Sequence, residues 1–171
     1  MAWADDVVEA FRSQQVRLVV YVADKVLVPV LDRIAADPQQ FRLVPLTREE
    51  EGVGILAGAF LGGVRGALLM QSSGFGNTLN GLASLAIPYQ VGFPMLISMR
   101  GTLGETNKAQ VPMGRALPEV LDSFGIPRYD LDRPEAVGAI TRGAARQAFG
   151  TGRPVGLLLA SVMTGGKGGG F

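Results

Sequence analysis

The sequence predicts an α/β fold with an open, mainly parallel β-sheet and helices on both of its faces. Short segments rich in apolar and β-branched residues alternate along the chain with helix-like segments of about 10–15 residues. Several of the strand-like segments are apolar almost without interruption, which is typical of strands covered on both faces. The chain has 171 residues, the usual size of one domain.

The elements of the first half each have their own signal. Residues 4–13 place Val7, Val8 and Phe11 on one helix face, and acidic residues occupy the first turns, where the helix dipole favours them. Val16–Val22 is β-branched and nearly continuous in apolar residues, which indicates a buried strand. The other expected elements are helices over 25–35 and 47–63 and strands over 41–46 and 67–71.

The second half repeats the alternation. We expect helices over 77–86, 113–124 and 134–149, and strands over 94–99, 128–131 and 155–160. The polar segment 100–112 is either a functional lid or a solvated connector, because loops of this length in compact domains are often functional. A single domain over 1–162 is therefore expected, followed by a flexible, glycine-rich tail over 163–171.

The composition excludes several classes of function. A net charge of +1 gives no electrostatic reason to expect nucleic acid or an anionic membrane. The absence of Cys and His excludes disulfides, thiolate metal sites and imidazole proton shuttles within this chain. The longest apolar run, 52–64, is shorter than the roughly 20 residues of a membrane span, and no signal peptide is indicated. We expect a cytoplasmic location.

Three consecutive acidic residues precede the most apolar segment of the chain. Thr47 and Glu50 have the spacing of a capping box, in which Glu50 reaches back to the backbone N–H of Thr47. Glu51 is then a first-turn acid favoured by the helix dipole. Glu49 is left free to face a cleft, although a purely structural role for all three acids is the alternative.

Polar residues follow the predicted strands at the edge where parallel sheets bind ligands. Asp24, Glu49, Gln71 and Ser72 come after three of these strands, so the predicted fold makes them neighbours. The segment Ser73–Asn77 is expected to be a glycine-rich turn before a helix, and such a turn can cradle an anion or be purely structural. It is neither a Walker loop nor a dinucleotide fingerprint, because the required Lys-Ser/Thr and third glycine are absent.

Two segments together resemble the pyrimidine-binding (PYR) domain of thiamine diphosphate enzymes. The first is Arg48-Glu49 with the following Val53–Gly58, and the second is Met70–Asn80, which reads MQSSGFGNTLN. The resemblance is strongest to the group of sulfopyruvate decarboxylase alpha subunits and phosphonopyruvate decarboxylases. It covers nearly all of residues 1–162 and implies the thiamine diphosphate-binding fold of PYR type.

The resemblance implies a catalytic role for one of the acids. In that family a glutamate hydrogen-bonds N1′ of the aminopyrimidine ring and so activates the cofactor for decarboxylation of a 2-oxo acid. Counting back nine residues from Gly58 identifies Glu49 as this acid, and counting from Ala59 gives Glu50 as the alternative. The resemblance further implies that the cofactor is bound by small and polar residues, namely Glu49, Gln71, Ser72, Ser73, Gly74, Gly76 and Asn77.

The implied substrate is an anionic 2-oxo acid, 3-sulfopyruvate or 3-phosphonopyruvate. We expect Asp24 and Arg100 to contact it, and Arg48, Arg100 or Lys108 could pair with its second anion. Family members that have active-site histidines carry them where this chain has other residues, so the resemblance does not indicate the proton donor. A carboligase subunit and a non-catalytic assembly module that retains the fold are the alternative functions.

The resemblance also implies a second subunit. Enzymes of this kind hold the diphosphate and Mg²⁺ through a Gly-Asp-Gly motif in a PP domain, and this chain contains no Gly-Asp-Gly. We therefore expect a hetero-oligomer in which a PP-domain (beta) subunit carries the diphosphate and Mg²⁺. No metal site is expected in this chain.

Overall fold

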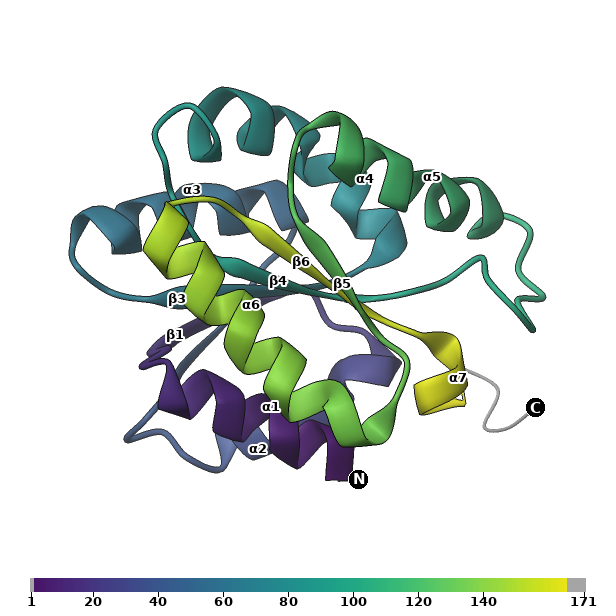
Figure 1. The fold of residues 1–171 in the computed structure, drawn as a ribbon, viewed down its shortest axis with the longest axis horizontal. Coiled ribbons are helices and arrows are strands. Elements are labelled where there is room, and N and C mark those ends of the chain that lie inside the picture. The colour runs from purple at the N-terminus through teal and green to yellow at the C-terminus, as the bar shows by residue number, and fades with distance from the viewer. Residues whose placement is uncertain (1, 166–171) are drawn as a thin grey trace.

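A computed structural model describes residues 2–165, which form a six-stranded parallel sheet with helices on both faces (Figure 1). The order of the strands across the sheet is β2-β1-β3-β4-β6-β5, and every neighbouring pair is parallel. The predicted α/β class is therefore confirmed. The strands are β1 (Leu18–Tyr21), β2 (Arg42–Pro45), β3 (Gly66–Gln71), β4 (Pro94–Ser98), β5 (Arg128–Leu131) and β6 (Val155–Leu159).

The helices divide between the two faces of the sheet (Figure 1). One face carries α1 (Ala2–Ser13), α2 (Val28–Ala35) and α6 (Val137–Thr151). The other carries α3 (Glu49–Leu61), α4 (Ser72–Gly81) and α5 (Val111–Ser123). Shorter helical segments are 3₁₀ turns over Lys25–Leu27 and Pro134–Ala136, a π-helical segment over Leu82–Ala86, and α7 (Ser161–Thr164).

The sheet separates two hydrophobic cores. Along β3, Ala67 and Leu69 pack into the core shared with α1, α2 and α6, whereas Leu68 and Met70 pack into the opposite core. All four side chains are fully buried. A strand between two helical layers needs apolar residues on both faces, which explains why the apolar runs read from the sequence are nearly continuous.

Helix α4 begins five residues earlier than the sequence predicts, at Ser72 instead of Asn77. The predicted glycine-rich turn over Ser73–Asn77 is therefore wrong, because these residues are helical. Glycine disfavours a helix interior by about 1 kcal/mol relative to alanine, so Gly74 and Gly76 conceal the helix in the sequence. The first of these two glycines has a specific reason in the site described below.

The predicted capping box is also wrong. Helix α3 begins at Glu49, and its N-cap is Arg48, which makes no side-chain cap bond. The backbone N–H of Thr47 donates to Oε2 of Glu51 at 3.1 Å, and Glu50 instead accepts a bond from Nε of Arg48 at 2.6 Å. The capping geometry is thus shifted by one residue, and the acid that reaches back is Glu51.

The C-terminal boundary differs in detail from the prediction. Helix α7 spans Ser161–Thr164, so the expected domain end at 162 falls inside a helix. The rest of the expected tail, 166–171, lies outside the described residues. In the described part of the chain, no helix is both long and apolar enough to cross a membrane.

Candidate active site

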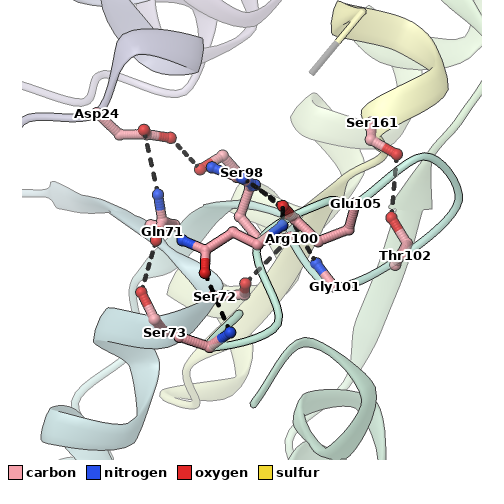
Figure 2. Close-up of polar contacts among 12 residues, drawn as sticks. Asp24, Gln71, Ser72, Ser73, Ser98, Arg100, Gly101, Thr102, Glu105 and Ser161 are labelled. Atoms are coloured by element: carbon pink, nitrogen blue, oxygen red, sulfur yellow. Dashed lines mark hydrogen bonds and ion pairs between the residues drawn. The ribbon is translucent and has the colours of Figure 1, made fainter. Parts of the chain in front are cut away.

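The first group of site residues lies at the carboxyl edge of the sheet, between β1 and β3. The chain leaves β1 toward α2 on one face and leaves β3 toward α4 on the other, and α/β proteins bind ligands outside the strand ends at a switch point of this kind. Asp24 and Gln71 meet at this switch point, where Nε2 of Gln71 donates to Oδ1 of Asp24 at 3.2 Å (Figure 2). The predicted proximity of these two residues is confirmed.

Asp24 is a buried acid, with 6% of its surface exposed. Its Oδ2 accepts a hydrogen bond from Oγ of Ser98 at 2.5 Å, and Ser98 ends β4 (Figure 2). Oγ of Ser73 donates to Oε1 of Gln71 at 2.6 Å, which extends the network into α4. The ends of β1, β3 and β4 are therefore joined to the start of α4 by side-chain hydrogen bonds.

Arg100 belongs to the same group through the backbone, because its N–H donates to Oγ of Ser72 at 3.1 Å (Figure 2). Its guanidinium is paired with Glu105 by two bonds, Nε to Oε2 at 2.6 Å and Nη2 to Oε1 at 2.7 Å. Both side chains are largely buried, at 11% and 6% exposure. The hydrogen bonds from Arg100 lower the pKa of Glu105 from 4.5 to about 2.

The backbone N–H groups of Gly101 and Asn107 also donate to Glu105, at 3.2 and 2.9 Å. Gly101 has φ +73°, and a Cβ there would lie 2.5 Å from the carbonyl oxygen of Gln110. The loop after β4 is consequently folded around one carboxylate and packed closely against the start of α5.

The second group of site residues surrounds Glu49, at the first position of α3. Among the three acids only Glu49 is buried, with 8% exposure. Its carboxyl group packs against the backbone of α4, since a Cβ on Gly74 would lie 2.0 Å from Oε1 of Glu49. Oε2 accepts a hydrogen bond from Nδ2 of Asn77 at 2.8 Å. Glycine at position 74 thus makes room for the acid.

The two oxygens of Glu49 differ in their surroundings. Oε2 has the amide of Asn77 as donor, whereas no hydrogen bond to Oε1 is present within residues 2–165. Glu50, the alternative acid, pairs with Arg48 on the surface, and that hydrogen bond lowers the pKa of Glu50. Gly76 is placed elsewhere, because its nearest neighbours are side-chain atoms of Met113 at 3.6 Å.

Two residues of the site escaped the sequence interpretation. Ser98 is a polar residue inside an apolar strand, and this exception is the signal that could have identified it. Glu105 has no such signal, since acids in polar loops are common. In the described part of the chain, no group of three acidic or other metal-ligating side chains could hold a metal ion.

The chain has relatives among known proteins. No protein-family model matches it. It is 47% identical over 116 residues to the sulfopyruvate decarboxylase subunit alpha of Methanothermobacter thermautotrophicus, covering 66% of this chain and 70% of the relative. It is 37% identical over 126 residues to the protein of the same name from Methanococcus maripaludis, covering 74% and 75%.

More distant similarities agree with these. The chain is 35% identical over 123 residues to a phosphonopyruvate decarboxylase of Streptomyces viridochromogenes, of which it covers 31%. The fold matches part of the 2-oxoglutarate:ferredoxin oxidoreductase of Magnetococcus marinus with a TM-score of 0.75 and 13% identity, covering 96% of this chain and 29% of that one. At this identity the structural match shows a common fold.

Proposed function

The chain belongs to the family of sulfopyruvate decarboxylase alpha subunits, and from this premise we propose that it is the PYR-domain subunit of a thiamine diphosphate-dependent decarboxylase. The proposed substrate is an anionic 2-oxo acid, 3-sulfopyruvate or 3-phosphonopyruvate. The relatives are named as decarboxylases of these two acids and give no support to a carboligase or a non-catalytic module.

This proposal rests on the carboxylate of Glu49, which is buried and packs on Gly74. Within residues 2–165, Oε2 has a donor and Oε1 has none. A ring nitrogen that carries a hydrogen would donate the hydrogen bond that Oε1 lacks within the described residues. Hydrogen bonds to a charged group are strong where water is largely excluded, which suits an acid that must polarise a heterocycle. Bound thiamine diphosphate would supply the electron sink for decarboxylation.

The wall around Glu49 is formed by the first turns of α4. We propose that Gln71, Ser72, Ser73, Gly74 and Gly76 line the pyrimidine end of the cofactor, and that Asn77 belongs to the same wall through its bond to Glu49. Helix α4 carries four of these residues together with Asn77, and Gly74 and Asn77 lie against the carboxyl group of Glu49.

We propose that a PP-domain (beta) subunit holds the diphosphate and Mg²⁺. Two relatives are named as subunit alpha, which implies a partner in those enzymes. The active species would then be a hetero-oligomer in the cytoplasm.

We propose that Asp24, which follows β1, and Arg100, which follows β4, contact the substrate. Arg100 bonds Glu105 through Nε and Nη2, and its Nη1 makes no hydrogen bond within the described residues. Guanidinium N–H groups bind tetrahedral anions well, so Nη1 could meet the sulfonate or phosphonate while the pair with Glu105 persists.

The test uses the complex assembled with its beta subunit. Glu49→Gln should lower the rate of CO₂ release from 3-sulfopyruvate by at least about 100-fold, because general acid–base groups contribute on this scale. Glu50→Gln is the matched control, since it removes an adjacent acid that pairs with Arg48 on the surface, and it should keep the rate within about twofold.

Two results would reject the proposal. Full activity of the Glu49→Gln complex would remove the assigned role of Glu49. Failure of the wild-type complex to bind thiamine diphosphate in a calorimetric titration would remove the enzyme function itself. Pyruvate, which lacks a second anion, serves as the comparison substrate.

A further inference from the structure

Within the described residues, Asn77 donates a side-chain hydrogen bond to Glu49, and the oxygen of the same amide also has a partner. Nδ2 of Asn77 donates to Oε2 of Glu49 at 2.8 Å, and Oδ1 accepts from Nη2 of Arg48 at 3.5 Å. A guanidinium can only donate and a carboxylate only accepts, so a single orientation of the amide satisfies both neighbours. The long contact from the exposed Arg48 therefore favours the same amide orientation that the carboxylate of Glu49 requires.

This contact determines which oxygen of Glu49 remains for a ligand. Oε2 is engaged by Asn77, and Oε1 lies against the backbone of Gly74 with no donor among residues 2–165. Rotation of the carboxyl group is limited on one side by Gly74 and on the other by the bond to Asn77. The two oxygens of the acid are thus distinguished by the protein before any ligand binds.

We propose that Asn77 is a positioning residue for Glu49. It holds Oε2 so that Oε1 is presented to N1′ of bound thiamine diphosphate, and it does not touch the cofactor itself. This inference rests on the proposed function and changes the role expected for Asn77, which the sequence placed among the cofactor-binding residues. A neutral amide donor is suited to this task, because an acid at the same place would compete with Glu49 for a proton.

The first experiment compares two ligands in calorimetric titrations of the assembled complex. Asn77→Ala should weaken the binding of thiamine diphosphate by about tenfold. It should leave unchanged, within about twofold, the affinity for an analogue in which a CH group replaces N1′, since Oε1 then has no ring nitrogen to meet. Asn80→Ala, which removes an exposed amide from the same helix, should change neither affinity.

The second experiment uses a nearly isosteric variant, Asn77→Asp. Two carboxylates at hydrogen-bonding distance cannot both remain ionised at neutral pH. The acidic limb of the pH profile of kcat/KM should therefore move to higher pH by about one unit. Loss of packing alone would lower the rate without moving this limb, and Asn80→Asp controls for the added charge on α4.

The outcomes separate this inference from the proposed function. Equal weakening of both ligands by Asn77→Ala would show that Asn77 contacts the cofactor, and no weakening of either would show that Glu49 is positioned without it. Both results overturn the inference while the decarboxylase function stands. A wild-type complex that binds neither ligand would instead reject the proposed function.

Discussion

Glu49 and Glu105 are two buried acids at the same edge of the sheet, and their surroundings differ. Glu105 accepts four hydrogen bonds, two from Arg100 and one each from the backbone N–H groups of Gly101 and Asn107. Glu49 accepts one, from Asn77, and its Oε1 has no donor within residues 2–165. Both carboxyl groups are largely shielded from solvent, with 8% exposure for Glu49 as a whole residue and 6% for the side chain of Glu105, so burial alone does not distinguish a structural acid from a candidate catalytic one. The unmet hydrogen-bonding capacity does.

The largest effect on stability should come from Glu105. Glu105→Gln leaves the buried guanidinium of Arg100 without its counter-charge, and removal of one partner of such a pair costs about 3 kcal/mol or more. Urea unfolding of the isolated chain measures this loss. Glu49→Gln, by contrast, should change the free energy of unfolding by less than about 1 kcal/mol. Equal losses in the two variants would remove the distinction drawn between these acids.

Gly74→Ala should lower activity by displacing the carboxyl group of Glu49, while leaving Glu105 and its partners unchanged. The new Cβ would lie 2.0 Å from Oε1 and 2.4 Å from the carboxyl carbon of Glu49, so the acid must move. Misplacement of a reacting group by about 1 Å costs on the order of 100-fold in rate. The measurement is kcat/KM of the assembled complex.

Gly54→Ala is the matched control, because Gly54 lies on α3, the helix that begins with Glu49, and a Cβ there would have no neighbour within 4 Å. Both substitutions raise the helix propensity by about 1 kcal/mol, so the control should be as active as the wild type and somewhat more stable. Similar activity losses in the two variants would show a general sensitivity of these helices to an added methyl group, and would not implicate the contact between Gly74 and Glu49.

The acid dependence of stability should follow Glu105. Its pKa is lowered to about 2 in the folded chain by Arg100, from 4.5 in the unfolded chain. The stabilisation is therefore complete above about pH 4.5 and is lost as the pH falls toward 2. Urea midpoints between pH 7 and pH 3 should fall less steeply for Glu105→Gln than for the wild type. Parallel curves would show that other acids cause the decline.

The smallest effect is expected at the surface acids beside Glu49. Glu51→Ala removes the acceptor of the Thr47 N–H and should cost about 1 kcal/mol of stability, as the loss of a helix cap does. Glu50→Ala removes an exposed pair with Arg48 and should cost less than about 0.5 kcal/mol. Thermal denaturation distinguishes the two, and the reverse order would favour the capping box expected from the sequence.

The fold was predictable because its inner strands are buried on both faces. β3, β4 and β6 each show a continuous apolar run, and such runs need no knowledge of their neighbours to be recognised. The start of α4 was not predictable from local preference. Its glycines disfavour a helix, and the reason for Gly74 lies in a contact with Glu49, which precedes it by 25 residues.

The acid of the candidate site, Glu49, was predictable from the sequence. The side chains that hydrogen-bond the site's acids were less predictable. Glu49 precedes an apolar helix at a strand end, and this arrangement is visible in the sequence. The bond from Ser98 to Asp24 joins residues 74 positions apart, and that from Asn77 to Glu49 spans 28. Such pairings depend on the order of strands across the sheet, which local patterns do not contain.

Because Gly74 and Glu49 approach each other so closely, substitutions at these two positions should have coupled effects. A side chain at position 74 is compatible with the fold only if the acid retracts, as a shorter aspartate at position 49 would allow. Substitutions at the two sites should therefore show sign epistasis: Glu49→Asp would relieve the clash of Gly74→Ala while leaving the carboxylate out of reach of a ring. The residue tolerated at each of these positions therefore depends on the residue at the other. Single substitutions can remove the acid, whereas moving it to another position would require coordinated changes at both sites.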